Sequence, residues 1–350
     1  MHLRELARSH LNAFAALPRA PLAVLPTPIT DAVRLREALG GERRCPQILL
    51  KRDDLTGLAL GGNKARKLEF LIGDARRAGA TVIVTTGAVQ SNHARMTAAA
   101  ARAVGLGVTL VLTSREPAPA RQGNYLLDRL FGATIHLIPA GPDPRLAVAP
   151  DEEQRVAEIV NDLRARGERP YVVPIGGSSA VGALGYAAAT LELVEQLAQM
   201  HVTPTRLYYA SGSRGTQAGL ELGARLFRPS YRLCGVAVSG GEDEKRIRAA
   251  RIATEAAGLL DVDVAIRPEE LETRQEYIGD GYGIPTPEGL EAIRLLAERE
   301  GVLLDPVYTA KAMAALVADV RAGAVAADDT IAFLHTGGVP ALFAHAEAFQ

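Results

Sequence analysis

A lysine within residues 61–69 is the residue of this sequence that is most evidently placed to act as a nucleophile. Two glycines and Asn63 precede Lys64 as turn and N-cap residues, and apolar residues follow it at helical spacing. We therefore expect Lys64 in the first turn of a helix, where the helix dipole disfavours an ammonium ion and lowers its pKa. A neutral amine is a nucleophile. The alternative is an ordinary solvated surface lysine, and we interpret Lys67 on the same helix as a solvated or structural charge.

A second group of small and hydroxyl-bearing residues could bind a phosphate. It consists of Ser211, Gly212, Ser213, Arg214, Gly215 and Thr216. Backbone N–H groups at a helix start favour an anion, and the hydroxyls of Ser213 and Thr216 add donors. The glycines at 212, 215 and 219 match neither a Walker loop nor a dinucleotide fingerprint, so a single phosphate is the better interpretation. The alternative is a plain glycine-rich turn between a strand and a helix.

Amide and hydroxyl groups gather at a third expected helix start, in Gln90, Ser91, Asn92 and His93. Such groups suit a carboxylate or a phenolate, although Ser91 or Asn92 could equally serve only as an N-cap. We expect His93 to be structural or to support its neighbours. The sequence has no metal-ligand spacing of His and Cys and no Gly-x-Ser-x-Gly elbow, so a metal centre and serine-hydrolase chemistry lack support.

The elements that must position these residues alternate between strands and helices. Apolar runs predict strands at 48–51, 81–86, 108–112, 134–138, 171–174, 206–210, 233–238, 262–264 and 330–335. Helical patterns separate most of them, which indicates an α/β fold with parallel sheets covered on both faces. Ligands bind at the carboxyl ends of such strands. Polar or glycine-rich turns follow four strands, at 87–93, 176–179, 211–216 and 336–338, and we expect a polar pocket there.

The combination of these groups predicts a specific cofactor. We expect a Schiff base to pyridoxal phosphate, because the sequence combines a lysine near a helix start, a loop for one phosphate and a group of amides and hydroxyls that could bind a carboxylate. The loop at 211–216 would anchor the phosphate end of the cofactor, and Lys64 would hold the other end.

Composition sets further bounds on function. The chain has 350 residues, with 39 Lys and Arg against 40 Asp and Glu, and 48% of its residues are hydrophobic. This length predicts one large or two ordinary domains, and the balanced charge gives no electrostatic case for nucleic acid or an anionic membrane. Cys45 and Cys234 lack a metal or redox spacing, and we find neither a signal core nor a membrane-spanning apolar run. We expect a cytoplasmic protein.

A series of longer motifs extends along nearly the whole chain. They are Lys51-Arg52-Asp53-Asp54, Gly61-Gly62-Asn63-Lys64-Ala65-Arg66-Lys67-Leu68-Glu69, Gln90-Ser91-Asn92-His93, Ser211-Gly212-Ser213-Arg214-Gly215-Thr216, Gly281-Tyr282-Gly283-Ile284-Pro285, Leu304-Asp305-Pro306-Val307-Tyr308-Thr309-Ala310-Lys311-Ala312-Met313 and His335-Thr336-Gly337-Gly338. In this order they resemble the D-cysteine desulfhydrase and aminocyclopropane-carboxylate deaminase family of fold type II pyridoxal-phosphate enzymes. The resemblance implies a tryptophan-synthase-β-like fold, with a small domain at 62–176 inserted in a large domain of 1–61 plus 177–350, and a homodimer.

The resemblance also implies catalytic and substrate-binding roles. Lys64 would be the Schiff-base lysine and, once released, would take the Cα proton of a small amino-acid substrate. Ser91, with Gln90 and Asn92, would hold the substrate carboxylate, and Asn92 would also bind the phenolic oxygen of the cofactor. Tyr282 and Tyr308 would flank cofactor and substrate, and either could protonate the leaving group.

Cofactor contacts are implied for the loop and for two threonines. Ser211, Gly212, Ser213, Gly215 and Thr216 would hold the phosphate. Deaminases that open the cyclopropane ring have a glutamate facing the pyridine nitrogen where this sequence has Thr309, and a leucine where it has Thr336. A neutral hydroxyl makes the ring a weaker electron sink, so we expect α,β-elimination of D-cysteine. The alternatives are L-cysteate sulfo-lyase, the deaminase, another pyridoxal-phosphate chemistry such as racemisation, and a non-catalytic ligand-binding protein. Arg214 leaves the substrate open.

Overall fold

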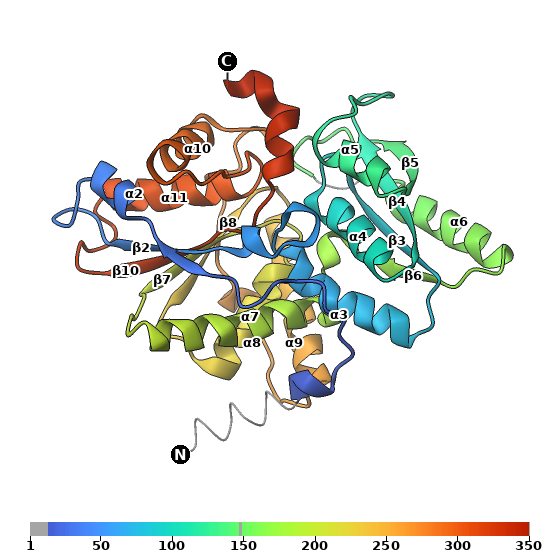
Figure 1. Ribbon diagram of the computed structural model, residues 1–350, viewed down its shortest axis with the longest axis horizontal. Helices are drawn as coiled ribbons and strands as arrows, with labels where there is room; N and C mark the ends of the chain where they lie inside the picture. The colour runs from blue at the N-terminus through green and yellow to red at the C-terminus, as the bar shows by residue number, and fades with distance from the viewer. Residues whose placement is uncertain (1–12, 147–148, 350) are drawn as a thin grey trace.

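Two sheets form the framework of the protein (Figure 1). The computed structural model describes residues 13–146 and 149–349. Within them, a six-stranded sheet has the order β1-β2-β10-β7-β8-β9 and a four-stranded sheet the order β5-β4-β3-β6. The strands are β1 (Ile29–Asp31), β2 (Gln47–Lys51), β3 (Val82–Ala88), β4 (Gly107–Ser114), β5 (Thr134–Pro139), β6 (Pro170–Val173), β7 (Arg206–Ser211), β8 (Arg232–Ala237), β9 (Thr273–Arg274) and β10 (Thr330–Leu334). Neighbouring strands run parallel except β1 and β2.

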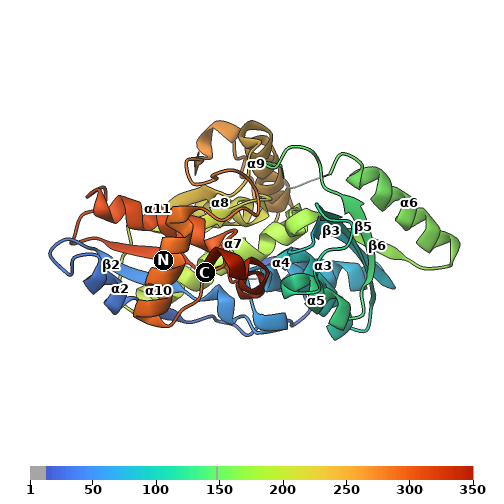
Figure 2. The same cartoon turned by 90° about the horizontal axis from the view of Figure 1, so that it is seen from above.

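Helices cover both faces of each sheet (Figures 1 and 2). On the six-stranded sheet, α2 (Val33–Ala38), α10 (Pro287–Glu300) and α11 (Thr309–Arg321) cover one face, and α7 (Ala180–Gln199), α8 (Gly215–Phe227) and α9 (Glu242–Leu259) lie on the other. On the four-stranded sheet, α3 (Lys64–Arg77), α4 (Asn92–Ala103) and α5 (Gly123–Leu130) lie opposite α6 (Glu152–Ala165). In the described part of the chain, no helix has both the length and the apolar character needed to cross a membrane.

The central strands are apolar on both sides because both sides face helices. In β10, Ile331 and Phe333 belong to the core under α10 and α11, whereas Ala332 and Leu334 belong to the core under α7. Successive side chains of a strand point to opposite faces, so a strand covered twice has no polar face to show. This is the continuous apolar pattern that the sequence displays, and the predicted α/β class with parallel sheets is confirmed.

One local expectation differs from the structure. Residues 262–264 form no strand, because Val262 and Val264 pack against the core of α9, and β8 pairs instead with β9. The last segment is a 3₁₀ helix, η5 (Val339–Phe349). Short 3₁₀ turns also occur at η1 (Asp53–Leu55), η2 (Leu58–Leu60), η3 (Ile175–Gly177) and η4 (Pro268–Glu270). The four-stranded sheet falls inside the range 62–176, but the domain bounds themselves stay a prediction.

A buried cluster of four charged side chains holds the first turn of α3 against β2 and α7. Arg66 donates to Asp53 at 2.8 Å through two nitrogens and to Glu192 at 2.7 and 3.0 Å. Lys51 donates to Glu192 at 2.5 Å. Burial acts to raise the pKa of Asp53, but the Arg66 guanidinium outweighs it and the pKa lies below its usual value. The cluster therefore fixes the position of the helix turn that carries Lys64.

Replacement of Asp53 by alanine should destabilise the protein strongly. Asp53 is fully buried, and its loss would leave Arg66 partly unpaired in the interior, which lowers the free energy of unfolding by about 3–5 kcal/mol. Glu158→Ala, which removes one partner of an exposed pair with Arg155, should change stability little. Urea unfolding followed by circular dichroism compares the two variants. Equal losses would contradict the importance of the buried cluster.

Candidate active site

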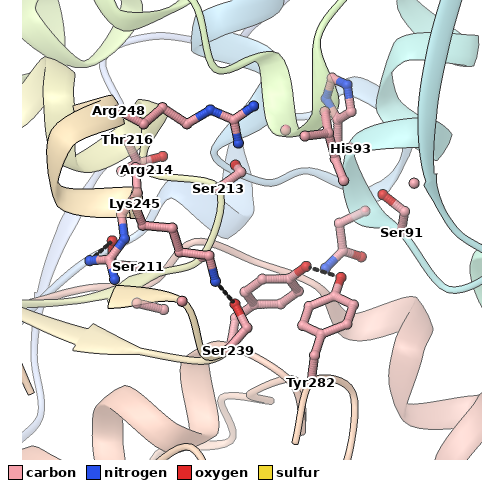
Figure 3. A pocket seen from close by; sticks show the side chains of 18 of the residues that line it. Ser91, His93, Ser211, Ser213, Arg214, Thr216, Ser239, Lys245, Arg248 and Tyr282 are labelled. Carbon is pink, nitrogen blue, oxygen red and sulfur yellow. Dashed lines mark hydrogen bonds between the residues drawn. The ribbon is translucent and has the colours of Figure 1, made fainter. Parts of the chain in front are cut away.

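A cavity of about 560 Å³ opens at the carboxyl ends of strands from both sheets (Figure 3). Gly87 lies in β3, Gly176 follows β6, Ser211 ends β7 and Thr336 follows β10, and all four line the cavity. Each of the four turns that the sequence singled out therefore contributes to one pocket. In Figure 3 the labelled side chains of Ser91, Ser213 and Tyr282 surround this space from different elements.

Lys64 is the first residue of α3, as predicted, and it lines the cavity. Its Nζ lies 3.4 Å from the carbonyl oxygen of Gly176, and burial lowers the pKa of Lys64 to about 8. The predicted N-cap role of Asn63 is wrong, because Asn63 has helical backbone angles and makes no side-chain cap. Its amide instead donates to the Thr216 hydroxyl at 3.1 Å, which joins the start of α3 to the 211–216 loop.

Lys67 is a cavity neighbour that the sequence analysis missed. It is not solvated but only 1% exposed, and its Nζ donates to the Gly176 carbonyl at 3.0 Å. A Cβ placed on Gly215 would lie 2.7 Å from this Nζ, so the loop backbone approaches the lysine closely. The three-residue spacing from Lys64 was the available signal, because it puts both amines on one side of the helix.

The lysines are all withdrawn from the surface, and among the described residues only Lys51 forms an ion pair with a carboxylate. The chain has five lysines, and none is exposed: Lys51, Lys64, Lys67, Lys245 and Lys311. Lys51 pairs with Glu192, but among the described residues neither Lys64 nor Lys67 has a carboxylate partner. Burial, and then the charge of Lys64, hold the pKa of Lys67 well below its usual value. Two buried amines without an anion favour a ligand that brings negative charge.

The 211–216 loop offers backbone and hydroxyl donors beside these amines. Ser213 and Thr216 line the cavity, and Gly215 begins α8. The Ser178 hydroxyl, which the sequence analysis also missed as a loop contact, donates to Ser213 at 2.8 Å and accepts the Gly215 N–H at 3.2 Å. Gly212 packs close to Tyr308, where a Cβ would lie 3.3 Å from the ring. The donor set and the helix start suit a phosphate.

Arg214 does not present its charge to the cavity. Its guanidinium donates to Glu242, to Gln217 at 2.8 Å and to Thr273 at 2.6 Å, and the side chain is 1% exposed. It also donates to the Ser211 hydroxyl at 3.2 Å, which in turn donates to Gln217 at 2.9 Å. Arg214 adopts the left-handed conformation, with φ of +73°, which turns its side chain behind the loop. The hydrogen bonds of Arg214 therefore stabilise the 211–216 loop through contacts with neighbouring segments.

Of the three residues predicted to hold the substrate carboxylate at the start of α4, two line the cavity and one does not. Ser91 and Asn92 line the cavity, and the Ser91 oxygen also caps α4 by accepting the Ala94 N–H at 3.2 Å. An oxygen that accepts in this way keeps its own proton to donate. Gln90 lies outside this cavity, because its amide is bound to the backbone of Gln122 and Asn124 at 3.1 and 2.9 Å. Its predicted contact with a substrate carboxylate stays a prediction that this geometry does not favour.

Two tyrosines and one of the two threonines line the cavity. The hydroxyls of Tyr282 and Tyr308 are 2.5 Å apart, and burial raises the pKa of both phenols. Thr336 lines the cavity. Thr309 does not, because it is fully buried and its hydroxyl donates to Asp305 at 2.7 Å at the start of α11. The contact of Thr309 with the cofactor ring therefore stays a prediction that this geometry does not favour.

His93 and the acidic groups complete the surroundings. Burial lowers the pKa of His93 well below its usual value, and its Nε2 lies 2.8 Å from the Thr85 hydroxyl. The neutral ring therefore packs beside the amines without adding positive charge. Among residues 13–146 and 149–349, no group of three or more His, Cys, Asp or Glu side chains is arranged to hold a metal ion.

Comparison with known proteins agrees with this geometry. Residues 20–337 match the family model described as "Pyridoxal-phosphate dependent enzyme". The chain belongs to the pyridoxal-phosphate-dependent enzyme family. It is 42% identical over 340 residues to the D-cysteine desulfhydrase of Salmonella choleraesuis (strain SC-B67), covering 96% of this chain and 98% of that protein. It is 45% identical over 339 residues to the D-cysteine desulfhydrase of Yersinia enterocolitica serotype O:8 / biotype 1B (strain NCTC 13174 / 8081), covering 95% and 98%.

A solved structure extends the comparison to the fold. A crystal structure of an "ACC deaminase homologue" superposes with a TM-score of 0.86 at 38% identity, covering 97% of this chain and 98% of that one. The pyridoxal-phosphate family uses an aldehyde cofactor with one phosphate, and the residues present fit it. The cavity is lined by an amine of lowered pKa and by the loop that leads into a helix start, and a second buried amine, without a carboxylate partner among the described residues, lies beside it.

The lowered pKa of Lys64 predicts its reactivity in the cofactor-free protein. Burial favours the neutral amine, so the neutral fraction should rise about tenfold between pH 7 and pH 9 around a midpoint of about 8. Cyanate labelling at a series of pH values, quantified by mass spectrometry of the peptide that carries Lys64, measures this midpoint. N-acetyl-lysine is the reference, with a pKa near 10.4. A midpoint at the reference value would contradict the effect of burial.

Proposed function

We propose that this enzyme is a lyase that converts D-cysteine and water to pyruvate, ammonia and hydrogen sulfide. Full-length similarity to two proteins named D-cysteine desulfhydrase supports this substrate. The observation that carries the proposal is the amine of Lys64, which faces the cavity with a pKa of about 8. An amine with this pKa is substantially neutral near pH 8 and can accept a proton.

The residues of the cavity divide the work of the reaction. When bound, pyridoxal phosphate supplies an electron sink for the pair left at Cα. Lys64 would hold the cofactor, and its amine would take the Cα proton of the substrate. Ser91 donates to the substrate carboxylate, and Asn92 donates to the phenolic oxygen. Tyr282 and Tyr308 orient the substrate and supply a proton to the departing sulfur.

The phosphate end is held by a separate set of groups. Lys67 supplies a positive charge, and the 211–216 loop supplies backbone N–H groups together with the hydroxyls of Ser213 and Thr216. Ser178 supports the loop through its contacts with Ser213 and Gly215. Binding the dianion would also restore the ammonium form of Lys67, whose pKa burial now depresses.

The neutral surroundings of the ring favour elimination over ring opening. Thr336 lines the cavity, whereas Thr309 is bound to Asp305, so we assign the contact with the pyridine nitrogen to Thr336. A hydroxyl does not hold the ring protonated as a carboxylate would, and elimination of sulfide demands less of the ring than opening a cyclopropane. Because the fold is similar to that of an ACC deaminase homologue, the substrate panel below also tests ring opening.

L-Cysteate is the second candidate substrate. Lys245 and Arg248 line the cavity from α9 and could attract a sulfonate, whereas Arg214 is turned away from the cavity. D-Cysteine carries no second anionic group at neutral pH, so it makes no use of these cations. The two substrates are therefore best separated by direct measurement.

We also propose a cytoplasmic homodimer with a small domain at 62–176 inserted in the large one. Both cysteines are free thiols, which supports a reducing compartment. Leu60, Leu130 and Phe343 are 66%, 71% and 68% exposed, and such apolar area supports a partner subunit. The balanced charge offers no attraction for nucleic acid.

The substrate proposal predicts a selective panel. D-Cysteine and β-chloro-D-alanine should release pyruvate, and aminocyclopropane carboxylate should release no 2-oxobutyrate, in an assay coupled to lactate dehydrogenase. The Lys64→Ala variant should lose at least about a thousandfold in kcat, because its base and its bond to the cofactor are both removed. Turnover of L-cysteate alone would overturn the D-cysteine assignment. Unchanged turnover by Lys64→Ala would overturn the mechanism.

The hydrogen-bonded tyrosines should act as one unit. Tyr282→Phe and Tyr308→Phe should each lower kcat for D-cysteine about a hundredfold, because each breaks the path that delivers a proton to the leaving sulfur. The double variant should lose no more kcat than the single variant that has the lower kcat. Steady-state kinetics with β-chloro-D-alanine provides the control, since chloride needs no proton to leave. Losses that multiply in the double variant would show two independent roles.

A further inference from the structure

Asn124 lies beside Asn92 where α5 packs against α4 (Figure 1). Its Nδ2 donates to the Asn92 Oδ1 at 2.8 Å and to the backbone carbonyl of Gln90 at 2.8 Å. Asn124 is fully buried. It is not among the residues that line the cavity, so it reaches the site only through its neighbour.

The partners of Asn124 determine which way its amide faces. A backbone carbonyl can only accept a hydrogen bond, so the NH₂ group of Asn124 must face Gln90. The reversed amide would place two acceptor oxygens against each other. The same NH₂ group also donates to Asn92, which can accept this hydrogen bond only through its side-chain oxygen. The orientation of both amides thus follows from one main-chain carbonyl.

The consequence for Asn92 is that its NH₂ group faces away from Asn124. A Cβ placed on Gly338 would lie 2.8 Å from this Nδ2, so the glycine leaves the space that the amide needs. Gly338 belongs to the turn after β10, next to the cavity residue Thr336. Asn92 therefore offers a hydrogen-bond donor, and not an acceptor, on its cavity side.

The other side of Asn124 argues against a role in packing alone. Its Oδ1 is buried and has no hydrogen-bond partner among the described residues. Leaving a buried amide oxygen unpaired costs about 1–3 kcal/mol, and an apolar side chain would avoid that cost. The NH₂ side is therefore the part of Asn124 that the fold uses.

We propose that Asn124 is a positioning residue that fixes the donor face of Asn92 toward the phenolic oxygen of the cofactor. This inference rests on the role of Asn92 in the proposed function. A donor stabilises the anionic phenolate, and a free asparagine amide would present its oxygen as readily as its nitrogen. Asn124 removes the second possibility.

The test is a double-mutant cycle on the cofactor-loaded enzyme. Asn92→Ala, Asn124→Ala and the double variant are compared with the parent protein by pH titration of the visible absorbance and by pyridoxal-phosphate affinity from fluorescence. Loss of the donor disfavours the phenolate, so the titration midpoint should rise by about one pH unit in Asn92→Ala and in the same direction in Asn124→Ala. The double variant should match Asn92→Ala.

Two further variants separate positioning from a general loss of structure. Asn124→Asp places a carboxylate that accepts from the Asn92 NH₂ group, so it should reverse that amide and shift the midpoint more than Asn124→Ala does. Asp128→Asn, one turn along α5, is the control, because burial raises the pKa of Asp128 to about 8 and the carboxyl is mostly neutral at pH 7. This control should leave the midpoint unchanged.

The outcomes distinguish this inference from the proposed function. An unchanged midpoint in Asn92→Ala would remove the proposed role of Asn92 itself. A shift in Asn92→Ala with none in Asn124→Ala, or additive shifts in the double variant, would overturn the positioning role while leaving the function intact. An equal shift in Asp128→Asn would mean that any change in α5 disturbs the site, and it would also overturn the inference.

Discussion

The buried pairing of Arg66 with Asp53 and Glu192 is the interaction on which the site depends. It joins η1 and the nearby α3 to α7, which is distant in the sequence, through charge-assisted hydrogen bonds of 2.7–3.0 Å. Charges removed from water are tolerated only when every partner is present. The cluster therefore accepts one arrangement of the three elements, and Lys64 stands two residues from its centre. Catalytic placement in this protein begins with an ion network that takes no part in the chemistry.

The interior contains two kinds of buried cation with opposite consequences. Arg66 and Lys51 have carboxylate partners and hold the fold together. Lys64 and Lys67 have carbonyl contacts but no carboxylate among the described residues, so burial drives them toward the neutral form. The first kind gives rigidity and the second gives reactivity and affinity for an anion. Arg66 lies between Lys64 and Lys67 at the start of α3, which brings the rigid support next to the reactive amine.

Much of the fold and part of the site could be predicted from the sequence, and the misses share one cause. Periodicity located most elements because burial on both faces of a sheet leaves a strong apolar pattern. Asn63, Gln90 and Thr309 have suitable chemistry, but their polar groups bind the Thr216 hydroxyl, the backbone of Gln122 and Asn124, and the Asp305 carboxylate. Lys67 was missed in the other direction, since its three-residue spacing from Lys64 indicates a shared side of the helix but does not show that the side chain is only 1% exposed. Motifs specify which groups are present, whereas the direction of each side chain depends on contacts between segments.

The absence of exposed lysines has a consequence for selectivity toward aldehydes. An aldehyde condenses with any accessible neutral primary amine, and surface lysines are the usual competitors for it. In this protein the positive charge of the surface is carried by arginine, whose guanidinium stays protonated and does not form such an adduct. Lys51, Lys245 and Lys311 are engaged with Glu192, Ser239 and backbone carbonyls. An arriving aldehyde therefore meets its reactive lysine inside the cavity, and the choice of lysine is made by the composition of the whole surface as well as by the site.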